Sequence, residues 1–162
     1  MLTTPLSVQS TLLEGFTANG SISYRSNHGY NFDPAYTSHA HGWSSGATSA
    51  LTFYVLGLTV TSPQGLTWQV APQPGGLTDV EGGFETGLGW FGVKWMISGG
   101  GKQMQLQLDT PVGTSGTVVV PSGFTGAVTM DGKAIANVSK GVNGSKKLQV
   151  QGGKHVVMAR TV

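Results

Sequence analysis

Strict alternation of polar and apolar residues marks the stretch Gln103-Met104-Gln105-Leu106-Gln107-Leu108. This period of two is typical of a β-strand that has one buried face and one exposed face. The same period recurs over residues 66–70 and 93–97. Trp68 and Trp95 fall on the apolar side of those two segments, so both indoles are expected in a core between sheets.

Further short strands are predicted after this stretch. They cover residues 117–120, 127–130, 133–138, 146–151 and 155–160. Asp131-Gly132 and Asn143-Gly144 are residue pairs that favour tight hairpin turns. About eight short strands at regular spacing predict a mainly β fold, an antiparallel β-sandwich of jelly-roll type. We assign it to residues 61–162.

Two short α-helices are predicted before the strands, over residues 5–17 and 47–57, with a loop between them. Ser44 or Ser45 is expected to cap the second helix. Apolar residues cover most of the circumference of that helix, so we expect it to be buried from more than one side. Residues 1–60 are therefore assigned to a separate domain.

The composition narrows the function classes. Only 10% of the 162 residues are charged, the net charge is +2, and cysteine is absent. Disulfides and thiolate metal sites are excluded, and the mild charge argues against a nucleic-acid partner. Six basic side chains follow Met130 against the single acid Asp131. They predict either a basic edge that discourages strand aggregation or a site for a polyanion.

Targeting and cofactor signals are sparse. No apolar run reaches the roughly 18 residues of a membrane span, and no signal peptide is visible. No phosphate-binding loop, dinucleotide fingerprint or zinc motif is present, so neither a cofactor nor a metal is expected. Asn19, Asn137 and Asn143 begin Asn-x-Ser sequons and are glycosylation candidates. They favour a secretory ancestry.

Aromatic and histidine side chains suggest a sugar site. Tyr36 and Trp43 offer flat faces, and His39 and His41 offer donors and acceptors. The alternative for the histidines is capping of the next helix and packing. Trp90 lies in a glycine-rich hairpin, where its ring is either exposed for stacking on a sugar or placed as a barrier over the end of the sandwich.

Several uncommon sequence motifs of this chain occur together in one known family. They are Ser10-Thr-Leu-Leu-Glu-Gly15, Tyr24-Arg-Ser-Asn27, Ser38-His-Ala-His-Gly-Trp-Ser-Ser-Gly-Ala-Thr-Ser-Ala-Leu-Thr-Phe-Tyr-Val-Leu-Gly57, Thr67-Trp-Gln-Val-Ala-Pro72 and Glu81-Gly-Gly-Phe-Glu-Thr-Gly-Leu-Gly-Trp90. In this order they resemble the C-terminal end of fungal α-L-rhamnosidase-like glycoside hydrolases, over nearly the whole chain. In that family a barrel of paired helices carries the active site and a β-sandwich follows. Residues 1–60 thus look like a remnant of the barrel.

The resemblance implies roles for three residues. Glu14 falls where the family has the general base of an inverting hydrolysis, and His41 where a histidine contacts the rhamnose ring. Trp43 is expected to shape the same pocket. Without the resemblance, the pattern of the predicted helix indicates that Glu14 is a solvated carboxylate on the helix surface. The family's general acid and most of its sugar contacts lie on segments that this sequence does not contain. We therefore expect little or no turnover from the isolated chain.

Three hypotheses about function follow. The first is a lectin-like β-sandwich that binds rhamnose- or galactose-type glycans and has lost full catalytic apparatus. The second is a fragment or subunit of an inverting α-L-rhamnosidase. The third is an interaction module that self-associates through the apolar 47–57 helix, unless residues 1–30 cover that helix.

Overall fold

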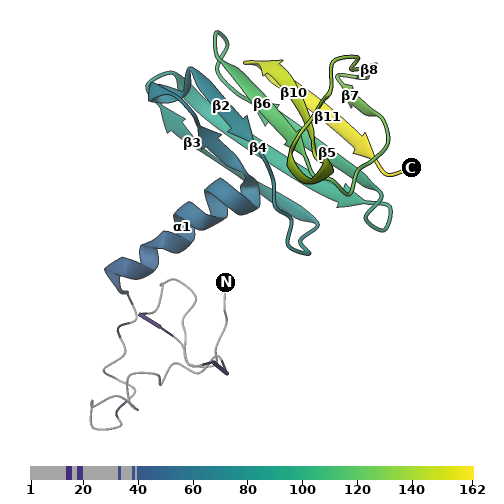
Figure 1. The fold of residues 1–162 in the computed structure, drawn as a ribbon. Coiled ribbons are helices and arrows are strands. Elements are labelled where there is room, and N and C mark those ends of the chain that lie inside the picture. The colour runs from purple at the N-terminus through teal and green to yellow at the C-terminus, as the bar shows by residue number, and fades with distance from the viewer. Residues whose placement is uncertain (1–13, 16–17, 20–32, 34–37, 39) are drawn as a thin grey trace. The chain divides into compact units, whose positions relative to one another are not determined.

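The computed structural model describes residues 14–15, 18–19, 33, 38 and 40–162. Within this part of the chain, eleven β-strands form two sheets (Figure 1). The strands are β1 (Leu58–Val60), β2 (Thr67–Val70), β3 (Asp79–Thr86), β4 (Gly89–Ser98), β5 (Gln103–Asp109), β6 (Ser115–Val120), β7 (Val128–Met130), β8 (Lys133–Ala134), β9 (Ser139–Lys140), β10 (Lys146–Gln151) and β11 (Lys154–Arg160). The predicted mainly β fold is confirmed.

The two sheets exchange strands along the chain. One sheet has the order β1-β2-β6-β10-β9, and the other has the order β3-β4-β5-β11-β7-β8. The chain leaves the first sheet after β2, builds β3 to β5 in the second, and returns with β6. Because β6 comes back beside β2 in the same direction, this pair is parallel. The predicted antiparallel β-sandwich is thus confirmed, with this one parallel pair among its strand pairs.

The core lies between the sheets and is assembled from alternate residues of the central strands. Trp68 and Trp95 are buried there, as the sequence predicted. The indole N–H of Trp68 donates to Thr114 Oγ1 at 2.9 Å, so its polar edge is satisfied. Leu66 was expected to share the buried face of β2, but it precedes the strand and is exposed.

The two predicted turns are confirmed. Asp131 and Gly132 join β7 to β8 with φ angles of 52° and 77°. Asn143 and Gly144 lie between β9 and β10 with φ angles of 55° and 78°. Such left-handed backbone is tolerated by glycine and by Asn or Asp. The predicted strand over residues 133–138 is shorter, since pairing stops at Ala134.

The short edge strands carry lysines. β8 and β9 end the two sheets, and Lys133 and Lys140 are exposed on them. Exposed lysines on short edges discourage pairing with another chain. The basic edge proposed from the composition therefore has a structural counterpart. A polyanion at the same lysines stays a prediction.

A helical segment precedes the sandwich and changes geometry along its length. It consists of η2 (Gly42–Ser45, a 3₁₀ turn), α1 (Gly46–Ala50) and η3 (Leu51–Leu56, π-helical). Because the segment begins at Gly42, Ser44 and Ser45 lie inside its first turn and the predicted cap position is wrong. Gly57 ends it with a φ of 85°. A side chain at Gly57 would also overlap with the backbone of Ala71 and Pro72.

The last turn of this segment is fixed to the sheets. Trp95 Nε1 donates to the carbonyl oxygen of Val55 at 3.2 Å, and Leu56 is buried. Leu51, Phe53 and Tyr54 are exposed. The expectation that the helix is buried from more than one side is therefore not met among the described residues.

The chain divides into two compact units, Met1–Ser49 and Ala50–Val162, and the division falls inside α1. The proposed boundary near residue 60 stays a prediction. Of the predicted 5–17 helix, Glu14 forms a bend and Gly15 is irregular, and the other described positions of the first unit before residue 42 are non-helical. The rest of that helix lies outside the described residues. In the part that is described, no helix has the length and apolar character to cross a membrane.

Candidate functional site

Trp90 lies on the outer face of the six-stranded sheet. On β4 its neighbours Phe91, Val93 and Trp95 point into the core, so the alternation of the strand turns Trp90 outward. The indole lies over Gly83 and Gly92, which are paired in register on β3 and β4. A Cβ atom on either glycine would overlap with the ring. The two glycines therefore form a flat floor for the indole.

The ring is an exposed platform and not a barrier over the end of the sandwich. Its residue keeps 50% of its surface exposed, whereas Trp95 on the same strand is fully buried. One ring face lies against the glycine floor, and the exposure belongs to the remaining surface. Of the two alternatives that the sequence left open for Trp90, the structure supports the exposed ring.

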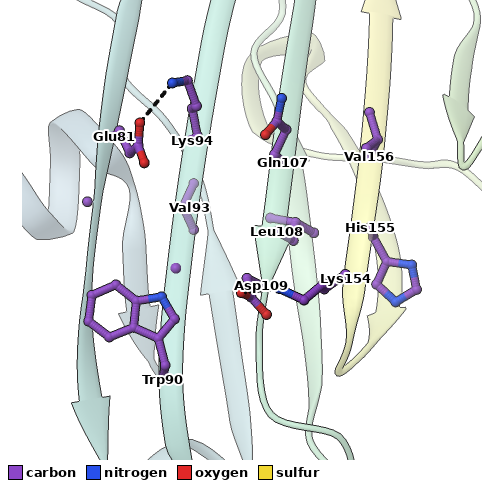
Figure 2. Close-up of a pocket in the computed structure, with 12 residues that line it drawn as sticks. Glu81, Trp90, Val93, Lys94, Gln107, Leu108, Asp109, Lys154, His155 and Val156 are labelled. Carbon is purple, nitrogen blue, oxygen red and sulfur yellow. Dashed lines mark hydrogen bonds and ion pairs between the residues drawn. The ribbon is translucent and has the colours of Figure 1, made fainter.

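Trp90 borders a shallow pocket of about 440 Å³ that extends over β3, β4, β5 and β11 (Figure 2). Two ion pairs lie in it. Lys94 Nζ is 2.8 Å from Glu81 Oε2, and Lys154 Nζ is 2.6 Å from Asp109 Oδ2. The hydrogen bond and charge of Glu81 raise the pKa of Lys94, so this cation stays protonated at neutral pH. The pocket thus combines an aromatic face with paired donors and acceptors.

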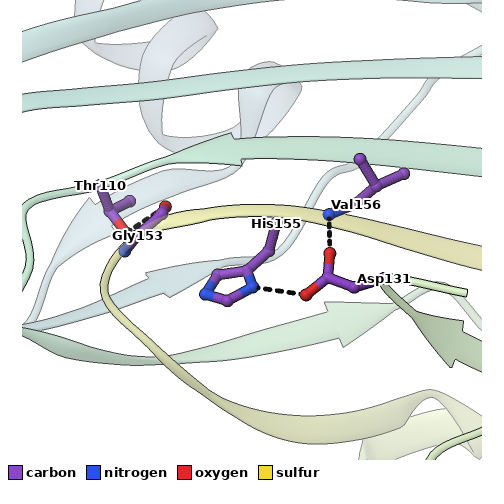
Figure 3. Close-up of polar contacts among 5 residues, drawn as sticks. All are labelled: Thr110, Asp131, Gly153, His155 and Val156. Carbon is purple, nitrogen blue, oxygen red and sulfur yellow. Dashed lines mark hydrogen bonds and ion pairs between the residues drawn. The ribbon is translucent and has the colours of Figure 1, made fainter. Parts of the chain in front are cut away.

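His155 lines one side of the pocket, and its imidazole contacts Asp131 on the β7–β8 turn (Figure 3). His155 Nδ1 lies 2.8 Å from Asp131 Oδ2, and the N–H of Val156 donates to Asp131 Oδ1 at 2.8 Å. These hydrogen bonds, with that from His155 the larger contribution, lower the pKa of Asp131. The imidazole thereby ties the β7–β8 turn to β11.

A second cluster gathers Glu14, Ser38 and His41 within the first unit. The Glu14 side chain is only 3% exposed, and its Oε2 lies 3.9 Å from His41 Nδ1. The N–H of Ser38 donates to the same Oε2 at 3.1 Å. The interpretation of Glu14 as a solvated carboxylate is therefore wrong. His41 is the N-cap residue of η2, but its side chain makes no capping hydrogen bond.

Trp43 belongs to this second cluster. Its ring centroid is 4.1 Å from that of His41, with 42° between the planes, and its Nε1 donates to the Glu14 carbonyl oxygen at 3.1 Å. The indole is 65% exposed. The structure thus brings together Glu14, His41 and Trp43, as the resemblance implied, and their roles stay predictions. The candidates Tyr36 and His39 lie outside the described residues.

Sequence reasoning missed the polar partners of Trp90. These partners occupy outward positions of strands with alternating polar and apolar residues, so their exposure could be predicted from the sequence. They are Lys94, Gln107, Asp109 and Lys154. Their convergence was not, because it depends on strand register. The structure pairs Gly92 with Asp109, and Asp109 with Lys154, across three neighbouring strands.

The remaining candidate residues are the glycosylation and metal-binding positions. The three sequon asparagines, Asn19, Asn137 and Asn143, are exposed, and their glycosylation stays a prediction. Among the described residues, no group of three or more His, Asp or Glu side chains is arranged to hold a metal ion.

These features define the class of the chain as a two-sheet β-sandwich domain with an aromatic platform on one outer face. Residues 58–134 match the family of the bacterial α-L-rhamnosidase C-terminal domain. The resemblance to the C-terminal end of α-L-rhamnosidases that was noted in the sequence is thereby confirmed. The expected fungal origin stays a prediction.

Three solved α-L-rhamnosidases share this fold. The enzyme from Dictyoglumus thermophilum matches with a TM-score of 0.69 at 18% identity, over 77% of this chain and 14% of its own. The enzyme from Streptomyces avermitilis, solved with L-rhamnose, gives 0.66 at 17%, over 78% and 12%. The enzyme from Aspergillus terreus gives 0.60 at 25%, also over 78% and 12%. This chain therefore spans only a small part of these enzymes. No curated protein matches it.

Proposed function

We propose that this chain is a carbohydrate-binding β-sandwich of the α-L-rhamnosidase type, and that it holds a glycan on the indole of Trp90. The observation that carries the proposal is the exposed ring supported by the Gly83–Gly92 floor inside a polar pocket. A flat ring of this kind stacks against the C–H face of a sugar, and neighbouring polar groups then bind the hydroxyls.

The supporting frame favours such a role. Trp90 lies on β4, where its backbone pairs with Glu85 of β3, and the ladder between β4 and β5 begins two residues later at Gly92 and Asp109. A side chain on a rigid strand loses little entropy when a ligand binds. The ion pairs of Lys94 and Lys154 are likewise set by strand register.

A glycan array with rhamnosides and galactosides tests the proposal, followed by titration of any ligand that it finds. Trp90→Ala should weaken binding at least about tenfold, because it removes the central stacking surface. Leu88→Ala is the matched control, since Leu88 is exposed on the same hairpin but does not border the pocket. A blank array, or full binding by Trp90→Ala, would contradict the proposal.

A second candidate function is supported by the Glu14 cluster. In this reading the chain is a fragment or subunit of an inverting α-L-rhamnosidase, with Glu14 as the general base that activates water. The shielded Glu14 carboxylate, 3.9 Å from His41 Nδ1, is the observation that favours it. The match to an α-L-rhamnosidase C-terminal domain supports the same family.

Release of sugar from an aryl α-L-rhamnoside tests this second function. If the chain hydrolyses the substrate, Glu14→Gln should abolish the release of sugar. Glu81→Gln, which removes a carboxylate of the sandwich, is the control and should not abolish it. Absence of product from the unchanged chain, or full activity in Glu14→Gln, would contradict a catalytic role for Glu14 in this chain.

A further inference from the structure

We infer that the ligand of the Trp90 pocket is an uncharged glycan of several sugar rings, held across four strands, and neither a single sugar nor a polyanion. This inference rests on the proposed carbohydrate binding. It is carried by the extent of the pocket, its charge balance and the position of Gln107.

The pocket extends well beyond the indole. The outward-facing residues around it form two rows across the sheet, and most of their side chains are polar. One row runs from the Gly83–Gly92 floor through Asp109 to Lys154, and the other from Glu81 through Lys94 and Gln107 to Val156. Three strand spacings of about 4.8 Å give the rows a length of roughly 14 Å. Figure 2 shows Trp90 at one side of the pocket and Lys154 and His155 at the other. We therefore expect one sugar ring stacked on the indole to leave the far end of both rows uncovered.

The charges of the pocket cancel. Glu81 is paired with Lys94, and Asp109 is paired with Lys154, at 2.8 Å and 2.6 Å. An anionic ligand would approach two carboxylates as well as two ammonium groups, so it gains no net attraction. A sugar hydroxyl can donate to a carboxylate while its neighbour accepts from an ammonium group. Each ion pair therefore suits neighbouring hydroxyls of a neutral glycan.

Gln107 lies between the two ion pairs. Its register partners are Lys94 on β4 and Val156 on β11, and its side chain is exposed. No hydrogen bond of the Gln107 side chain is found among the described residues. Its amide offers two donors and an acceptor at the centre of the pocket. A ring bound there would be the next one along from a ring stacked on Trp90.

Titration against a ladder of ligands tests the inference. The ladder contains a galactose monosaccharide, neutral galacto-oligosaccharides of two to four rings, and acidic oligogalacturonates of the same lengths. Affinity should rise at least about tenfold from the monosaccharide to the neutral trisaccharide. Raising the salt from low to high concentration should change it less than about twofold, since no net charge is neutralised.

Two substitutions on one strand sharpen the test. Gln107→Ala should weaken the trisaccharide about five- to tenfold and leave monosaccharide binding unchanged, because only the longer ligand reaches that amide. Gln105→Ala is the matched control, since Gln105 faces the same side of β5 but lies outside the pocket.

The outcomes separate the inference from the proposed function. Equal affinity for one ring and three, or tighter binding of the acidic series that salt weakens, would overturn the inference and leave carbohydrate binding intact. Binding of no sugar in the ladder or on the glycan array would overturn both.

Discussion

The two indole clusters of this chain contain the same kinds of groups but are built differently. Trp90 rests on a floor of paired glycines and borders a pocket that also contains His155 and two ion pairs set by strand register. Trp43 stands beside His41 and a shielded Glu14, on a 3₁₀ turn and on residues without regular structure. Strand pairing alone can thus hold an exposed indole and its polar neighbours in place. The second cluster depends on individual hydrogen bonds between distant residues.

The largest expected effect is on the stability of the hydrophobic core beneath the Trp90 pocket. Trp95→Ala should lower the free energy of unfolding by about 3–5 kcal/mol, because its indole is fully buried and its N–H is bonded to Val55. Trp43→Ala should change it by less than about 0.5 kcal/mol, since that indole is largely exposed. Denaturant unfolding measures both. Comparable losses in the two variants would remove the contrast between the clusters.

The next effect concerns the glycine floor. Gly92→Val should displace the Trp90 ring and lower glycan affinity at least about tenfold. Valine is favoured in strands, so the free energy of unfolding should change by no more than about 1 kcal/mol. Titration and unfolding of the same sample separate the two. Unaltered binding by Gly92→Val would show that the floor does not position the indole.

A smaller effect is expected on the part of the helical segment that follows Trp43, residues 46–56. Its exposed Leu51, Phe53 and Tyr54 are proposed to pair with a second copy of the chain. Phe53→Asp should weaken that association about tenfold, and Thr48→Asp, on the preceding turn, should not. Sedimentation velocity at micromolar concentration reads the outcome. A monomer in the unchanged chain would contradict self-association.

The smallest effect is a pH dependence at the β7–β8 turn. The pKa of Asp131 is lowered in the folded chain, so its hydrogen bonds stabilise the fold above the unfolded pKa near 3.9 and are lost as pH falls through the folded pKa. Asp131→Asn should cost under about 1 kcal/mol at pH 6, because the pair is partly exposed. The difference between variant and original should shrink from pH 5 to pH 2. A difference that stays constant over this range would contradict the assignment.

Much of the fold could be predicted because strand alternation is a local property. The strand at 103–108 and the burial of Trp68 and Trp95 follow directly from it. β3 was missed, since Gly82 and Gly83 interrupt its pattern, and the parallel β2–β6 pair was missed because it depends on the path of the chain between sheets.

The candidate site was predictable only in part. Trp90 could be singled out as an indole in a glycine-rich hairpin, but its floor requires that Gly83 and Gly92 face each other across two strands. The bond between His155 and Asp131 joins positions 24 residues apart, and no local pattern marks it. The Glu14 cluster was suggested by family resemblance and not by periodicity.

The indole N–H resonances of the ¹⁵N-labelled chain, followed as a neutral trisaccharide is added, test the central claim most directly. Trp90→Phe identifies the Trp90 signal by its loss. We expect this signal to shift on titration while those of the buried Trp68 and Trp95 and of Trp43 stay in place. A shift confined to Trp43, or no shift at any indole at saturating sugar, would contradict it.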